Sequence, residues 1–234
     1  MIDFHTHILP GIDDGANDIS TSLKMLEMLY NDGVEGVVAT PHFDAEKDDL
    51  NEFLSKRNMA YNLILEEAKN RNIQIPNIYL GAEVRIVPHL SEVCDLSKLC
   101  ITSSNYILLE MPFNNRSMWI FDEIYSITIY KKLIPVMAHI DRYIRAKDDF
   151  SFYTNLFDMN VCFQVNQDCY FSISSRRKAK KLASYDAIQF IGTDCHNLTD
   201  RKPYFAKCVK LMRKCHGVEF LDKVFNNSKV IINM

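Results

Sequence analysis

The chain has 234 residues, of which 47% are hydrophobic, and a formal net charge of −3. This length suffices for one sizeable hydrophobic core, and we expect a single domain over residues 1–234. The 27 basic and 30 acidic residues leave no basic excess, so the composition argues against a nucleic-acid-binding or membrane-surface protein.

The amino-terminal segment has neither the basic nor the apolar run of a signal peptide. Apolar stretches such as Ile134–Ala138 are far too short to span a bilayer. The seven cysteines are scattered, odd in number and without a CxxC pair, which favours free thiols in a reducing compartment. We therefore expect a cytoplasmic protein that is not embedded in a membrane.

Apolar, β-rich runs alternate with helical patterns along the chain. The expected strands are Asp3–Ile8, Gly36–Thr40, Ile78–Ile86, Tyr106–Pro112, Ile134–His139, Val161–Asn166 and Ala187–Thr193. The first helix is expected after Asp18 as N-cap, with apolar residues at spacings of three and four, and it should end at Asp32-Gly33. Further helices are expected over Asp49–Asn70, Met118–Lys132, Arg176–Ser184 and Lys202–Lys214.

Seven strands, each followed by a helix or a long loop, predict parallel pairing. We expect an α/β fold, a single-domain distorted (β/α)7 barrel, because a barrel gathers all strand ends at one mouth. Polar residues lie at or near the carboxyl ends of these strands, where active sites of such barrels form. They are His5, His7, His42, Glu110, His139, Asp194 and His196, while Glu83 lies inside a long strand.

His5-Thr6-His7 places two imidazoles on the same face of one strand, because side chains alternate along a strand. Any one of these polar residues could simply be a buried group bonded to backbone. Taken together they indicate metal binding, since nearly every strand offers a His, Asp or Glu at the same end. Mixed His and carboxylate ligands suit zinc, manganese or iron better than calcium. Their number implies two or three divalent ions.

One segment is distinctive in its whole length, namely Asp3-Phe4-His5-Thr6-His7-Ile8-Leu9-Pro10-Gly11-Ile12-Asp13-Asp14-Gly15-Ala16. It resembles the opening motif of bacterial protein-tyrosine phosphatases of the PHP superfamily, the capsule-regulating CpsB/YwqE kind. The later motifs follow in the family's order: Ala39-Thr40-Pro41-His42, Gly81-Ala82-Glu83, Leu109-Glu110, His139 with Arg142, and Gly192-Thr193-Asp194-Cys195-His196-Asn197. The resemblance covers essentially the whole chain and implies a barrel of the PHP type.

The resemblance also implies a trinuclear metal site, with manganese as the expected ion and iron or zinc as alternatives. Its ligands would be His5, His7, Asp14, His42, Glu83, Glu110, His139, Asp194 and His196. Glu83 would bridge ions, and the family pattern favours Asp14 over Asp13. Arg142 and Arg201 would correspond to the phosphate-binding arginines.

Two departures from the family pattern concern the substrate side of the site. Ile140-Asp141 replaces the usual Pro-Glu between His139 and Arg142, and Asp141 is only a weak candidate for a general acid. The strand ending at Asn166 continues into Gln167-Asp168-Cys169-Tyr170, where the family has small residues and glycine. We expect this second change to alter the shape of the substrate pocket.

The implied reaction is hydrolysis of phosphotyrosine on proteins, with metal ions activating water and arginines holding the phosphoryl group. The implied partner is a bacterial tyrosine autokinase that controls capsular or extracellular polysaccharide synthesis. The oligomeric state stays open, with a homo-oligomer among the options.

Three other interpretations compete. Cys195 to Arg201 fits the C-x5-R pattern of cysteine-dependent phosphatases, but that loop has no glycine and would place Asp200 beside the phosphate. A PHP phosphatase for a small metabolite such as histidinol phosphate is the alternative that the ligand set leaves open. A non-enzymatic scaffold would need a damaged metal site, and no ligand position is substituted.

Overall fold

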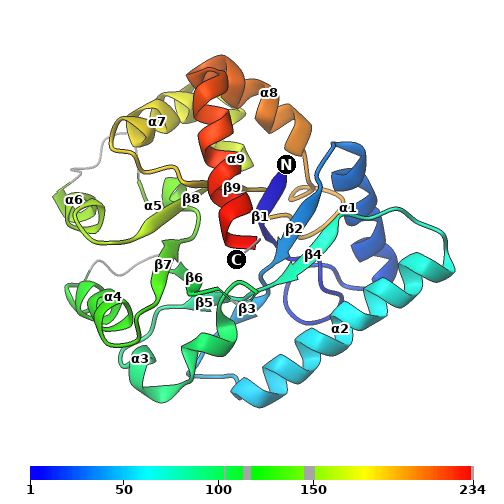
Figure 1. The fold of residues 1–234 in the computed structure, drawn as a ribbon, viewed down its shortest axis with the longest axis horizontal. Coiled ribbons are helices and arrows are strands. Elements are labelled where there is room, and N and C mark those ends of the chain that lie inside the picture. Colours follow the sequence, from blue (N-terminus) through cyan, green and yellow to red (C-terminus); the bar gives the residue numbers. More distant parts are fainter. Residues whose placement is uncertain (103, 113–116, 145–150, 233–234) are drawn as a thin grey trace.

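The computed structural model describes residues 1–102, 104–112, 117–144 and 151–232. Its strands are β1 (Ile2–Thr6), β2 (Gly36–Ala39), β3 (His42–Phe43), β4 (Asn77–Leu80), β5 (Glu83–Arg85), β6 (Tyr106–Glu110), β7 (Ile134–Met137), β8 (Cys162–Asn166) and β9 (Phe190–Gly192). All the strand pairs within these residues are parallel. Figure 1 shows the strands at the centre of the molecule and the helices around them.

Two barrel strands are each bent into two short segments. Only Thr40-Pro41 separates β2 from β3, and only Gly81-Ala82 separates β4 from β5. The first halves pair with each other, and the second halves pair in turn through His42 and Glu83. Pro41 has no N–H to donate, which explains the break in the ladder there. The prediction of one continuous strand over Ile78–Ile86 was therefore wrong.

The strands form a ring in sequence order. β1 pairs with β2 and β2 with β4, while β3 pairs with β5 and the pairing continues through β6, β7, β8 and β9. The ring closes because Asp194 N donates to His5 O at 2.8 Å and His7 N donates to Cys195 O at 3.0 Å. Counting each bent strand once gives seven strands in the described chain. The predicted distorted (β/α)7 barrel is confirmed.

The helices are α1 (Ile19–Asn31), α2 (Leu50–Asn70), α3 (Leu90–Val93), α4 (Trp119–Ile129), α5 (Ile140–Tyr143), α6 (Ser151–Phe157), α7 (Ile173–Ser184), α8 (Phe205–His216) and α9 (Val218–Ile232), with 3-10 turns η1 (Leu96–Leu99) and η2 (Gln167–Tyr170). Asp18 caps α1 by accepting a hydrogen bond from Thr21 N at 2.7 Å, as predicted. The α7 helix begins earlier than predicted, because Ser172 forms a capping box with Ser175. Among the described residues, no helix combines the length and apolar composition that crossing a bilayer requires.

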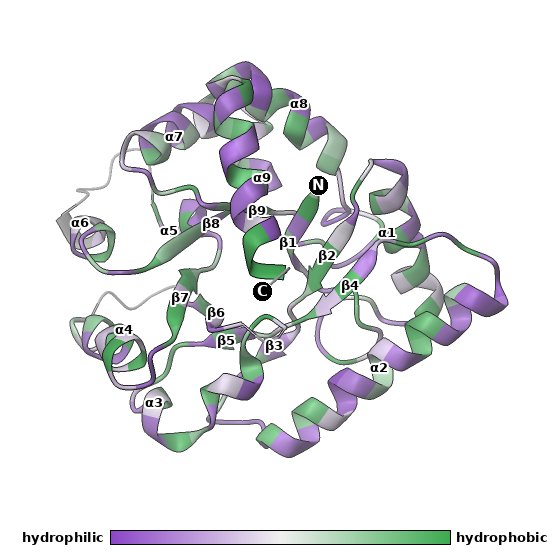
Figure 2. Ribbon diagram, in the orientation of Figure 1, coloured by the Kyte–Doolittle hydropathy of each residue, from purple (hydrophilic) through white to green (hydrophobic). Residues whose placement is uncertain are grey.

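A small apolar core lies inside the ring and supports the polar site. On most strands an inward apolar residue precedes the polar residue at the strand end. This core consists of Ile2, Phe4, Val38, Ile101, Leu108, Val136, Ala138, Phe190 and Ile231. The Phe4 and Phe190 rings stack with centroids 4.0 Å apart. Figure 2 shows the apolar carboxyl-terminal end of α9 at the centre of the ring, and Ile231 of this helix joins the core.

Candidate metal centre

Glu83 lies at the centre of the polar cluster at the carboxyl ends of the strands. Its Oε2 atom lies 3.1 Å from Nε2 of both His5 and His7, and 3.2 Å from Nδ1 of His42. Its Oε1 atom lies 2.7 Å from Nε2 of His139. One carboxylate thus faces four imidazoles from three barrel segments: β1 with the residue after it, β3 and the end of β7. This placement supports the expectation that Glu83 bridges ions.

The remaining expected ligands surround this centre. Glu110 Oε1 lies 3.5 Å from His139 Nε2. Asp194 Oδ1 lies 3.5 Å from His7 Nε2 and 3.8 Å from His5 Nε2. The structure therefore brings all nine predicted ligands into one cluster. Three groups of them have ligand atoms within 4.8 Å of one another: His7, Asp14, His42 and His196; His5, His7 and Glu83; and His42, Glu83 and Glu110.

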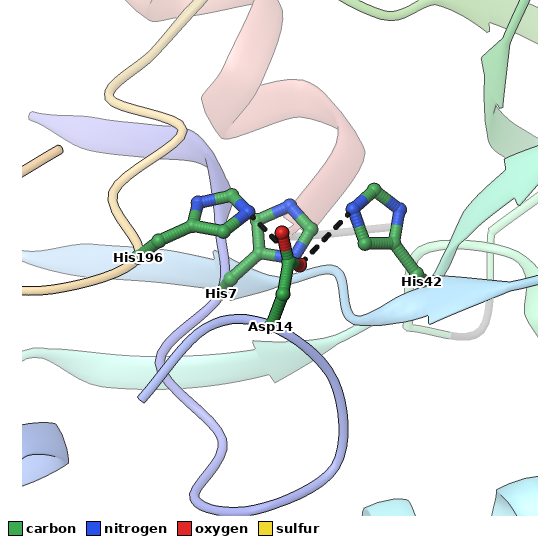
Figure 3. Close-up of side chains that lie close together, drawn as sticks. All are labelled: His7, Asp14, His42 and His196. Atoms are coloured by element: carbon green, nitrogen blue, oxygen red, sulfur yellow. Dashed lines mark ion pairs between the residues drawn. The ribbon is translucent and has the colours of Figure 1, made fainter. Parts of the chain in front are cut away.

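Asp13 and Asp14 take different positions. The Asp13 side chain is 5% exposed, and its Oδ2 lies 2.7 Å from Nδ1 of His7. The Asp14 side chain is 64% exposed, and its Oδ1 lies 3.4 Å from Nε2 of both His42 and His196. Figure 3 shows Asp14 between these two rings, with His7 beside it. This geometry favours Asp14 as the ligand and Asp13 as the residue that orients His7.

Hydrogen bonds fix which nitrogen of three histidines faces the cluster. Nδ1 of His5 contacts Gln164 Oε1 at 3.2 Å, Nδ1 of His7 contacts Asp13, and Nδ1 of His196 contacts Asp194 O at 2.9 Å. Each bond uses the Nδ1 proton and leaves Nε2 for a metal ion, as outer-shell partners do in metal sites. Sequence reasoning missed Gln164, because a polar residue inside a strand gives no sign of what it will contact.

The charges of the buried groups depend on one another. Burial lowers the pKa of His7, but the neighbouring Asp13 and Glu83 carboxylates outweigh it and raise that pKa to about 10. Burial and the nearby His7 lower the pKa of His196 to about 3. Burial raises the pKa of Glu83, but the adjacent histidines hold it well below its usual range. Divalent cations would replace these protons as the positive charge that the carboxylates need.

Nε2 of His196 is buried and forms no hydrogen bond among the described residues, although Asp14 Oδ1 lies 3.4 Å from it. A buried nitrogen that lacks a hydrogen bond is costly, whereas a metal ion between it and Asp14 would satisfy both groups. The residues present therefore fit a divalent metal centre: they are His, Asp and Glu side chains, three histidines turn Nε2 toward the centre, and Nε2 of His196 lacks a hydrogen bond.

The backbone is strained at two expected ligands. His139 has φ +32° and Asp194 has φ +52°, a left-handed conformation that is uncommon outside glycine. Such strain clusters at functional sites, where the surrounding structure holds it in place. Gly192 keeps this region tightly packed, because a Cβ there would lie only 2.6 Å from the Cβ of His5.

Both predicted arginines meet Asp194. Arg142 follows β7 in the short helix α5 and forms an ion pair with Asp194 Oδ2. Arg201 Nη2 lies 3.0 Å from Asp194 Oδ1, and its Nη1 lies 3.7 Å from Asp14 Oδ2. Each arginine side chain is 33% exposed, so both can reach a ligand that enters from solvent.

Asp141 has a different environment from these arginines. Its side chain is buried, and its Oδ1 accepts a hydrogen bond from Asn166 N at 2.9 Å. Asn166 in turn donates from Nδ2 to Asp194 Oδ2 at 2.8 Å. These bonds favour a structural role for Asp141 over that of a general acid.

The C-x5-R segment does not form a phosphate-binding loop. Cys195 is fully buried, and burial raises the pKa of its thiol well above the usual value. The Thr199 and Arg201 amides donate to Asn197 Oδ1, each at 3.0 Å. They are therefore not aimed at a common anion, which supports rejecting a cysteine nucleophile.

Comparison with known proteins shows the family to which this chain belongs. The family model described as "Capsular polysaccharide synthesis, CpsB/CapC" matches residues 1–233. The chain belongs to this family. The predicted resemblance to CpsB/YwqE-like proteins is thereby confirmed.

Among the relatives of this CpsB/CapC member is tyrosine-protein phosphatase YwqE of Bacillus subtilis, 27% identical over 99% of this chain and 91% of that protein. The putative tyrosine-protein phosphatase CapC of Staphylococcus aureus is also 27% identical, with the same coverage. Tyrosine-protein phosphatase CpsB of Streptococcus agalactiae is 25% identical over 96% of this chain and 95% of that protein.

Solved structures confirm the fold of this CpsB/CapC member. A crystal structure from work on YwqE of Bacillus subtilis and CpsB of Streptococcus pneumoniae, described as metal-dependent tyrosine phosphatases, superposes with a TM-score of 0.87. It has 24% identity and covers 100% of this chain and 94% of that one. A phosphotriesterase homology protein of Escherichia coli superposes with a TM-score of 0.55 at 10% identity, over 95% of this chain and 94% of that one.

Proposed function

We propose that residues 1–234 form one metal-dependent phosphatase domain that hydrolyses phosphotyrosine on proteins. The observation that carries the proposal is the cluster of nine His, Asp and Glu side chains that includes Glu83 at its centre, with Arg142 and Arg201 at its edge. Relatives that match nearly the whole chain are named tyrosine-protein phosphatases, which supports the same activity here.

The nine clustered side chains would hold two or three divalent ions, and manganese is the ion we propose, with iron or zinc as alternatives. Bound ions would make water a better nucleophile near neutral pH and would supply positive charge for the phosphoryl oxygens. Asp13 and Gln164 hold His7 and His5 with Nε2 facing the centre. Asp194 anchors the arginines beside that centre.

Arg142 and Arg201 bind and orient the phosphoryl group. A guanidinium fork matches the spacing of phosphate oxygens, and its planar geometry fixes the direction of the scissile bond. The arginines come from segments after β7 and β9, so they approach Asp194 from two sides. Substrate would compete with Asp194 for their donors once that carboxylate binds a cation.

The partner we propose is a bacterial tyrosine autokinase of capsular or extracellular polysaccharide synthesis. The description of the matched family supports this process. We place the reaction in the cytoplasm.

The alternative substrate is a small phosphomonoester such as histidinol phosphate, because the metal centre does not select the leaving alcohol. The test is metal analysis of the purified protein together with activity assays on a phosphotyrosine peptide, a phosphoserine peptide and histidinol phosphate. We expect a manganese-stimulated preference for phosphotyrosine. A preference for histidinol phosphate would overturn the proposed substrate while leaving the metal centre in place.

A further inference from the structure

A cavity opens beside the two arginines, on the side of the loops that follow β8 and β9. Residues that line it include Arg142, Asp168, Phe171, Arg201, Lys202 and Tyr204. Part of its wall is η2 and the residue after it, the segment in which the sequence departs from the family pattern. The departure thus lies in the wall of a cavity that also contains the proposed phosphate-binding groups.

A buried glutamine joins the two loops into one wall. Gln167 is 3% exposed and comes from η2. Its Nε2 donates to Lys202 O at 3.0 Å, and its Oε1 accepts from Tyr204 N at 2.8 Å. Two hydrogen bonds from one side chain fix the spacing between the loops, so the aromatic residues that they carry have defined positions.

Those aromatic residues are Phe171 and Tyr204. Their rings meet edge to face, with centroids 6.0 Å apart and an interplanar angle of 82°. Lys207 Nζ lies 4.2 Å from the Phe171 centroid and 5.3 Å from the Tyr204 centroid. Cation–π attraction from this ammonium group helps to hold both rings in place. Tyr204 is nevertheless 38% exposed. An ordered aromatic pair that remains accessible is suited to binding another ring.

We propose that Phe171 and Tyr204 bind the phenyl ring of phosphotyrosine while Arg142 and Arg201 hold its phosphoryl group. The inference rests on the proposed function. It holds that contacts with these two residues make the enzyme prefer aryl phosphates to alkyl phosphates. In phosphotyrosine a single ester oxygen separates the ring from phosphorus. The ring must therefore lie close to the phosphate, and this cavity has both arginines and both aromatic side chains in its lining.

The test is steady-state kinetics of manganese-loaded Phe171→Ala and Tyr204→Ala on a phosphotyrosine peptide and on phenyl phosphate. We expect KM to rise about tenfold, the effect of losing one aromatic contact with its buried area. The inhibition constant of inorganic phosphate, which has no ring, should stay unchanged. Tyr204→Phe keeps the ring and should behave as wild type.

Two further variants separate recognition from folding. Phe171→Leu retains apolar bulk but removes the aromatic face, so it should keep the melting temperature and still raise KM for phenyl phosphate. Tyr130→Ala is the matched control, because Tyr130 forms an exposed edge-to-face pair with Tyr125 on another part of the surface. It should leave all kinetic constants unchanged.

The outcomes distinguish this inference from the proposed function. Unchanged KM values in Phe171→Ala and Tyr204→Ala, with an active wild type, would overturn ring recognition alone. An equal loss of phosphate inhibition would also overturn it, since the residues would then support the phosphate subsite as a whole. A manganese-loaded wild type without activity on any aryl phosphate would overturn the proposed function and this inference together.

Discussion

Asp13 Oδ2 lies 2.7 Å from Nδ1 of His7, so Asp13 orients this histidine, whereas the adjacent Asp14 is placed to bind a metal ion. Asp13 also accepts hydrogen bonds from the Gly15 and His42 amides at 2.9 and 3.0 Å, so it organises the loop that presents Asp14. Burial raises the pKa of Asp13, but the His7 contact and these bonds lower it to about 2, so Asp13 is ionised at neutral pH.

Asp13→Asn should weaken metal binding about 10- to 100-fold, the usual cost of removing a partner of a ligating histidine. High metal concentration should restore its activity. Asp14→Ala removes a ligand and should lower the metal content even at saturating metal. The measurement is elemental analysis combined with a metal titration of activity. Full metal content in Asp14→Ala would reverse the two assignments.

Metal removal should abolish activity, whereas thiol loss should not. The reason is the fully buried Cys195, whose thiol has a raised pKa, set against a cluster rich in metal ligands. We expect EDTA to stop hydrolysis of a phosphotyrosine peptide and manganese to restore it. Cys195→Ser should retain most activity. A Cys195→Ser protein that binds its metals but is inactive would refute the metal mechanism.

Replacing both His5 and His7 with Ala should remove two ligands that face Glu83. Activity should fall by orders of magnitude, and bound metal should decrease. The barrel should persist, because the core below the site is apolar and contains neither histidine. Far-ultraviolet circular dichroism and elemental analysis check the two halves of this expectation. His89→Ala, at an exposed histidine outside the cluster, is the matched control. Unchanged metal content in the double variant would show that the ligands are misassigned.

Arg142→Ala should lower kcat/KM by about 10²-fold or more, the range seen when one positioned donor is removed from a charged transition state. Metal content should stay unchanged, because the Arg142 guanidinium forms an ion pair with Asp194 and does not itself bind a metal ion. Arg142→Lys should rescue only partly, because an ammonium keeps the charge but loses the fork. Arg201→Ala should have a smaller effect. Kinetics close to wild type for Arg142→Ala would reduce this residue to a structural ion pair.

The strand-end residues of the site could be predicted because apolar runs ended at His or carboxylate residues in nearly every strand. Parallel pairing then gathers those ends, whatever the details of the loops. His5 and His7 were especially informative, since their spacing places them on one strand face. Their closeness to Glu83 bears out that geometry.

Other features depend on tertiary contacts that the local pattern does not encode. The bends at Thr40-Pro41 and Gly81-Ala82 place Glu83 at the start of a strand instead of inside one. The tasks of Gln164 and Asn166 follow only from what lies opposite them. Helix α9 is not among the predicted helices, although its sequence contains a helical pattern. Its buried residues recur at spacings of three and four, from Leu221 and Val224 to Ser228 and Ile231.

The position of Ile231 against Ile2 and Phe4 has a consequence for how the molecule is made. Residues from the first strand and from the last helix share one small core. The first strand therefore cannot complete its core contacts until segments more than 200 residues later in the chain have been synthesised. Contacts of such long sequence separation slow folding, because loop closure must precede their stabilising effect. We expect an early nascent chain to hold an open, incomplete sheet, and ring closure to be a late event on the ribosome or after release.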